Sequence, residues 1–372
     1  MERQKLSQAV KTFLWVQIIL FLALAFYPLT AGAKGPPVEF PGSKRGQEAI
    51  TALGDRLPEV AMRYGKSAER MRELFLQNND LLLDPDDLLV YLCNFELGEG
   101  ETPEASEGSE VATAPRPLDQ TFFLHSRPGA SKVIYLDFDG HTTSGTHWNT
   151  AYNEGADIVS EPFDIDGSSQ FSNGELERIQ EIWSRVVEDF VMYDVDVTTE
   201  DPGSAALLRS GIGDQYYGVR VVISPTRDWY GAVGGVAYIG SFNWSTDTPA
   251  FVFTSSMGSP TNPSYAKNIA EASSHETGHT LSLYHDGITG GTEYYGGHGD
   301  WAPIMGVSYA NEVTQWSKGE YEGANNTEDD LAEMLTEGIS YRADDHADSI
   351  GINATPIGGT TISVSGIIEE IT

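Results

Sequence analysis

Three histidines within eleven residues constrain this chain more than any other feature. They are His275, His279 and His285, in the stretch SSHETGHTLSLYHDG. Residues four apart lie on one side of a helix, so His275 and His279 can face a single metal ion. Six further helical residues would carry His285 about 9 Å along the axis. The helix must therefore end soon after His279, and the chain must turn back to bring in His285.

The residue pattern around this stretch alternates between strands and helices. Apolar residues recur at helical spacing over 46–77 and 173–191, and over 262–285 with Ser264 as the N-cap. Short apolar runs predict strands at 87–97, 132–140, 195–201, 218–225, 234–242 and 249–255. Strands interleaved with long helices predict an α/β (α+β) fold whose strands are at least partly parallel.

The first 33 residues have the order of an export signal. A basic start precedes an apolar run from Phe13 to Phe26, and small residues end the segment at Ala33. We expect cleavage after Ala33, a secreted or extracellular protein and no stable membrane insertion afterwards. The alternative is an uncleaved anchor, because the apolar stretch is only slightly short for a membrane span.

Changes in composition divide the rest of the chain. We expect a signal peptide (1–33), a propeptide-like helical unit (34–96), an acidic linker rich in Pro, Ser and Gly (97–118), a catalytic domain (119–341) and the start of an incomplete β-rich region (342–372).

Charge and cysteine content exclude several classes of protein. The net charge of −33 disfavours nucleic acid as a partner, and it suits cation binding. The single cysteine, Cys93, excludes an internal disulfide. Its apolar strand-like setting, VYLCNFE, favours a buried structural cysteine; the alternative is a thiolate of the prosegment that occupies the open position of the metal.

Three neutral imidazoles with one open position are the ligand set of a catalytic zinc site. Such an ion lowers the pKa of its bound water, and Glu276, next to the first histidine, can take up the proton. This chemistry hydrolyses an amide bond, so protein or peptide substrates are expected. The sequence leaves two alternatives: a non-catalytic binding or adhesion module with structural zinc, and a zinc hydrolase of non-peptide amides or esters.

The stretch HETGHTLSLYH, followed by Met305 in WAPIMGVSY, resembles the signature of the metzincin zinc peptidases. Asp286 directly after the third histidine is similar to the reprolysin or adamalysin branch, and residues 132–333 resemble its secreted bacterial members. The resemblance implies a twisted, mostly parallel sheet with an antiparallel edge strand, an active-site helix, a backing helix and a shallow cleft. It also implies that Met305 lies beneath the zinc.

The resemblance suggests further roles around the cleft. The stretch GGVAYIGSF is the candidate edge strand, in which Gly235 and Ala237 would contact substrate. Tyr309 would stabilise the oxyanion or pack in the wall of the specificity pocket. His298, in a Gly-rich loop, is interpreted as a structural residue, with contact to substrate as the alternative.

One position departs from the family pattern. Ser282 stands where the family has a glycine, at a turn that commonly needs positive φ. Serine can adopt that conformation at a cost of about 1–2 kcal/mol. If the turn fails, Asp286 is the substitute ligand. Separately, the DFDG and DIDG stretches (137–140 and 164–167) allow calcium as a second cation, although plain turns explain them as well.

Overall fold

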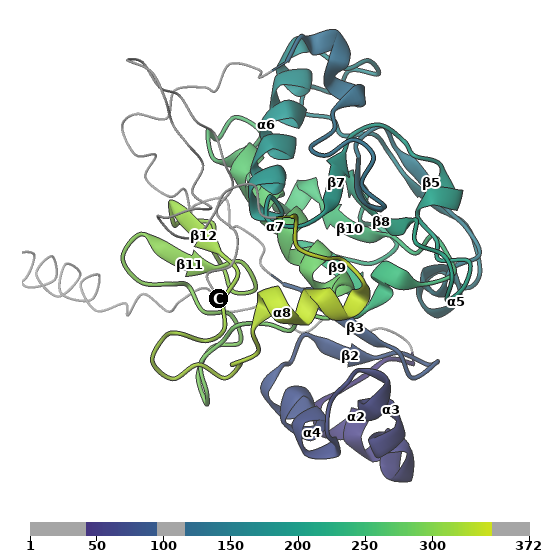
Figure 1. Cartoon of the computed structure of the whole chain (residues 1–372), viewed down its shortest axis with the longest axis vertical. Helices are drawn as coiled ribbons and strands as arrows, with labels where there is room; N and C mark the ends of the chain where they lie inside the picture. The colour runs from purple at the N-terminus through teal and green to yellow at the C-terminus, as the bar shows by residue number, and fades with distance from the viewer. Residues whose placement is uncertain (1–41, 95–115, 344–372) are drawn as a thin grey trace, which may run out of the picture. The chain divides into compact units, whose positions relative to one another are not determined.

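The computed structural model describes residues 42–94 and 116–343 (Figure 1). The expected signal peptide lies outside these residues, as do nearly all of the linker and of the C-terminal region. The core element is an eight-stranded sheet in the order β1-β2-β3-β9-β10-β8-β4-β7. Its strands are β1 (Lys44–Arg45), β2 (Leu81–Leu83), β3 (Leu89–Cys93), β4 (Lys132–Asp137), β7 (Val195–Thr198), β8 (Tyr217–Ser224), β9 (Gly235–Tyr238) and β10 (Ala250–Phe253).

One half of the sheet is parallel. β10 pairs with β8, β8 with β4 and β4 with β7, all in parallel register, whereas β9 runs antiparallel to β10. All eight residues of β8 are buried, as expected for a strand covered on both faces. The mixed α/β class is confirmed, but the sheet is not mostly parallel, because β9, β3, β2 and β1 all pair in antiparallel register.

The position of β9 corrects one expectation. The stretch GGVAYIGSF forms the antiparallel strand but not an edge, because β3 pairs with its outer side in antiparallel register. β2 continues the sheet beyond β3 (Figure 1), and β1 pairs with β2. An exposed strand edge leaves backbone groups unpaired, and a strand from the N-terminal region satisfies them here.

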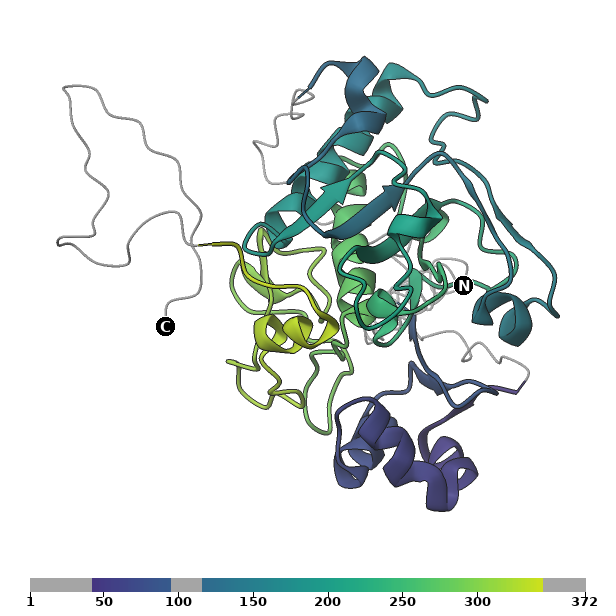
Figure 2. The same cartoon turned by 45° about the vertical axis from the view of Figure 1, so that its right-hand side comes forward.

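The helices are α2 (Gly46–Leu53), α3 (Leu57–Arg63), α4 (Ala68–Gln77), α5 (His147–Tyr152), α6 (Asn173–Asp189), α7 (Tyr265–Thr280) and α8 (Asp330–Met334). α6 begins with a capping box in which Ser172 and Glu175 satisfy each other's backbone N–H groups. It lies beside α7 (Figure 2) and buries Ile179, Ile182 and Val186. Within the described ranges no helix has the length and hydrophobicity of a membrane span.

Two small sheets complete the fold. β5 (His141–Thr143) pairs with β6 (Ile158–Ser160), and β11 (Trp301–Pro303) with β12 (Val313–Gln315). β11 ends at Pro303, two residues before Met305.

Candidate metal centre

The three histidines of the HETGHTLSLYH stretch converge with Cys93 in one buried group. The Nε2 atoms of His279 and His285 are 3.2 Å apart. The sulfur of Cys93 lies 3.3 Å from Nε2 of His279 and 3.5 Å from Nε2 of His285. With His275, these residues offer four ligand atoms that all lie within 4.8 Å of one another. The group could hold a metal ion.

Each imidazole is oriented through its other ring nitrogen. Nδ1 of His275 lies 2.8 Å from the carbonyl oxygen of Ile304, and Nδ1 of His279 lies 2.9 Å from that of Leu283. Nδ1 of His285 lies 3.2 Å from a carboxylate oxygen of Glu293. Because these acceptors need a proton on Nδ1, they place the Nε2 lone pairs in the centre of the group, as in metal-ligating histidines.

Burial favours the neutral form of His275 and His279. It lowers the pKa of His275 to about 4. Burial also lowers the pKa of His279 well below its usual value, and the neighbouring His275 and His285 lower it further. Neutral imidazole is the form that binds a metal.

The turn after α7 forms as the histidine spacing requires. α7 ends at Thr280, and the backbone then reverses at Ser282, whose φ is +72°. Backbone hydrogen bonds from Ser282 to His279 and from Leu283 to Gly278, both 3.0 Å, close the turn. The serine thus adopts the left-handed conformation expected of the glycine position, and its hydroxyl donates to the carboxylate of Glu337.

Glu276 lies fully buried next to the ligands. Among the described residues, neither of its carboxylate oxygens has a hydrogen-bond donor of good geometry. Burial raises its pKa well above the usual range, and the thiol of Cys93 offsets part of this effect. The carboxylate also explains a glycine on the sheet, because a Cβ at Gly235 would collide with it. A buried carboxylate without strong partners is unfavourable for stability alone.

Cys93 reaches the group because β3 pairs with β9. The register aligns Cys93 with Gly235, at the end of β9 that lies beside Glu276. Its burial in a strand was expected, and the contact of its sulfur with the histidines favours the alternative that the sequence left open, a thiolate at the metal. Burial raises the pKa of the thiol well above its usual range, with Glu276 adding to the effect. A bound cation would oppose this effect.

Met305 and Tyr309, to which the resemblance assigned roles in the site, are both buried. Met305 is fully buried, and a Cβ at Gly278 of α7 would come within 2.7 Å of its sulfur. Close packing of the methionine under the helix therefore requires Gly278, which sequence reasoning did not single out. Tyr309 is also buried; its pKa is raised by burial and then by the charges of Cys93 and Glu276. Ala237 lies opposite Tyr91 in the β3–β9 register.

Besides the β3–β9 pairing, ion pairs and hydrogen bonds attach the N-terminal helices and strands to the rest of the fold. Lys66, before α4, forms ion pairs with Glu328 (3.1 Å) and Glu333 (2.7 Å), and its side chain is 8% exposed. Glu293, which orients His285, also accepts hydrogen bonds from the backbone of Asn79 and Asp80. These contacts and the β3–β9 pairing fix residues 42–94 over the metal centre, and none of them has a local sequence signal.

Other candidate residues lie outside this group. Asp286 is buried, but it is not among the four candidate ligands. The turn at Ser282 forms and brings His285 into the group, so Asp286 does not take its place. The exposed His298 pairs with the hydroxyl of Tyr295 at 3.0 Å. In the DFDG stretch, Asp137 forms a buried ion pair with Arg220 at 2.6 Å.

In the DIDG stretch, Asp164 and Asp166 come within ligand distance of Glu175. The oxygens of Glu175 already accept backbone hydrogen bonds from Ile165 and Ser172. Calcium there stays a prediction.

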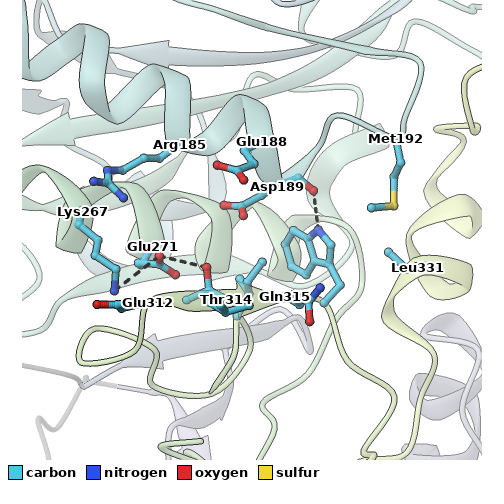
Figure 3. Close-up of a pocket in the computed structure, with 13 residues that line it drawn as sticks. Arg185, Glu188, Asp189, Met192, Lys267, Glu271, Glu312, Thr314, Gln315 and Leu331 are labelled. Atoms are coloured by element: carbon cyan, nitrogen blue, oxygen red, sulfur yellow. Dashed lines mark hydrogen bonds and ion pairs between the residues drawn. The ribbon is translucent and has the colours of Figure 1, made fainter. Parts of the chain in front are cut away.

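A cavity of about 370 Å³ lies between α6, α7 and β12 (Figure 3). Asp189 and Glu271 line it, and burial raises the pKa of each. Glu271 lies 3.9 Å from the ammonium group of Lys267. The four candidate ligands do not line this cavity; it adjoins the metal centre through Ile304, whose carbonyl orients His275.

Comparison with protein-family models, with curated proteins and with solved structures found no significant match.

Proposed function

We propose that this protein is a secreted zinc-dependent endopeptidase in which His275, His279 and His285 bind the metal and Glu276 is the general base. The observation that carries the proposal is the burial of Glu276 beside three histidines whose ligand atoms lie within 4.8 Å of one another. A purely structural metal site with these ligands has no use for the Glu276 carboxylate. Hydrolysis, in contrast, requires a general base beside the metal.

Zinc fits the donor set and its dimensions. Zinc binds imidazole nitrogen at about 2.0–2.1 Å and thiolate sulfur at about 2.3 Å, in a tetrahedron. Those lengths imply separations of about 3.3 Å between two nitrogens and about 3.5 Å between sulfur and nitrogen. The contacts of 3.2, 3.3 and 3.5 Å within the group agree with both values.

A bound zinc would supply Lewis acidity, which lowers the pKa of water and polarises the carbonyl of the peptide bond. Glu276 would accept the proton of the attacking water on its carboxylate and deliver it to the leaving amine. β9 would bind the backbone of the extended substrate through its outer edge. The hydroxyl of Tyr309, buried near Glu276, is the proposed donor to the developing oxyanion.

In this proposal, residues 42–94 keep the enzyme latent. β3 occupies the outer edge of β9, and the sulfur of Cys93 takes the fourth position around the metal. Substrate can bind only after β3 leaves. Cleavage of the chain between 95 and 115 would separate β3 covalently from the rest of the fold and allow it to dissociate.

A second candidate is a non-catalytic module with structural zinc, and the position of Cys93 favours it. Four protein ligands close a zinc site, which is typical of structural sites. The two candidates differ in what Glu276 does and in whether the Cys93 position can open.

The test uses the full-length protein loaded with zinc, with a specific protease site introduced between 95 and 115. Peptide mixtures are digested before and after that site is cut, and Glu276→Gln serves as the matched control. We expect cleavage only after the cut, its loss with a chelator, and its loss in Glu276→Gln at equal zinc content. Equal zinc content with no cleavage of peptides by either protein would favour the structural site. Hydrolysis of esters or simple amides alone would favour a non-peptide hydrolase.

A further inference from the structure

The environment of Tyr91 on β3 shows what the site accepts from an extended chain. Tyr91 and Cys93 are two residues apart, so their side chains lie on the same face of the strand. The sulfur of Cys93 contacts the histidines, and Tyr91 is fully buried beside it. β3 therefore presents an aromatic side chain two residues before the residue at the metal ligands.

The ring of Tyr91 lies among three aromatic rings, one at the end of α7 and two just after the helix. It stacks on His279 with the ring centres 4.3 Å apart and the planes at 17°. Its centre is 3.9 Å from that of His285 and 6.0 Å from that of Tyr284, which it meets edge-on. Two of the three rings belong to candidate metal ligands, so this pocket is a fixed part of the metal centre.

The sheet leaves room for a large side chain at this position. In the β3–β9 register, Ala237 lies opposite Tyr91, and its methyl group is the smallest side chain after hydrogen. The next position along the same face pairs Cys93 with Gly235. Small residues on β9 therefore face the two positions of β3 that point to the metal centre.

From this arrangement we infer that the site is specific for peptides with an aromatic residue two positions before the residue at the metal, in the pocket formed by His279, Tyr284 and His285. The inference rests on the proposed peptidase function and adds its substrate class. A peptide that replaces β3 on β9 would run in the same direction and would place its aromatic ring where Tyr91 lies. Aromatic stacking and burial of the ring both favour such a peptide over one with a small residue.

The test compares four peptides on the zinc-loaded full-length protein after cleavage between 95 and 115. Each has the sequence of residues 87–96 with the change Cys93→Ala, and the position of Tyr91 is Tyr, Phe, Leu or Ala. kcat/KM and the site of cleavage are measured, together with the displacement of the cut N-terminal fragment by each peptide. The leucine peptide separates ring stacking from simple apolar bulk.

We expect Tyr and Phe to exceed Ala by about tenfold to a hundredfold in kcat/KM, with Leu between them. Cleavage should fall at a bond of the residue two positions after the ring. Hydrolysis of the Ala peptide within twofold of the Tyr peptide would overturn the specificity and leave the peptidase function standing. Displacement in the order Tyr, Leu, Ala without hydrolysis would support the pocket and reject the peptidase. If no peptide is cut or displaces the fragment, both are rejected.

Discussion

The substitutions Ser282→Ala and Ser282→Gly separate two contributions to the turn that brings His285 to the metal centre. The left-handed backbone at φ +72° disfavours a residue with a Cβ by about 1–2 kcal/mol. Ser282 is only 8% exposed, and its hydroxyl donates a hydrogen bond to Glu337. This hydrogen bond contributes about 1–2 kcal/mol to the free energy of unfolding. Alanine loses the hydrogen bond and keeps the strain, whereas glycine loses both.

We therefore expect Ser282→Ala to lower the free energy of unfolding by about 1–2 kcal/mol. The loss in Ser282→Gly should be smaller by about 1 kcal/mol, because part of the relief is offset by the greater freedom of glycine in the unfolded chain. Urea unfolding of the full-length protein with matched zinc content measures both. Equal stability of the two variants would refute the strain at this position, and an unchanged Ser282→Ala would refute the hydrogen bond.

The same pair predicts a dependence on pH. Burial raises the pKa of Glu337 to about 7, and the hydrogen bond from Ser282 opposes that rise. A raised carboxyl pKa favours the folded state at low pH, and this contribution is lost as the pH rises from about 4.5 through 7. Because Ser282→Ala raises this pKa further, its destabilisation should be larger at pH 8 than at pH 5. Glu337→Gln should abolish the difference, and an equal effect of Ser282→Ala at both values would contradict the assignment.

Three further predictions concern the contacts around the metal centre. Cys93→Ala should weaken zinc binding at least about tenfold and leave the uncut protein inactive, because β3 still occupies the outer edge of β9; unchanged affinity in a zinc titration would show that the sulfur is not a ligand. Lys66→Met should remove the cation that Glu328 and Glu333 share and lower the free energy of unfolding by about 1–3 kcal/mol, with Lys318→Met, whose side chain is exposed, as the control. Gly235→Ala should reduce kcat/KM of the cut protein at least about tenfold at unchanged zinc content, because the new methyl group displaces Glu276; full activity would contradict that contact.

Part of the metal centre follows from spacing alone. The i, i+4 periodicity of a helix puts His275 and His279 on one face, and the distance to His285 requires a turn near Ser282. Both features hold in the structure, because they depend on backbone geometry within eleven residues. The main strands and helices were predicted for the same reason, since apolar periodicity reports local burial.

The tertiary structure decided what lies over that centre. β3 could have been a separate strand of a helical unit, and nothing in VYLCNFE indicates that it pairs with β9 more than 140 residues later. Strand pairing depends on backbone hydrogen bonds, which every residue except proline can donate. The partner of an apolar strand therefore cannot be predicted from the sequence of that strand alone. Cys93 and Tyr91 contact His279, and Lys66 pairs with Glu328 and Glu333. These contacts join segments far apart in the sequence, so only the folded chain brings them together.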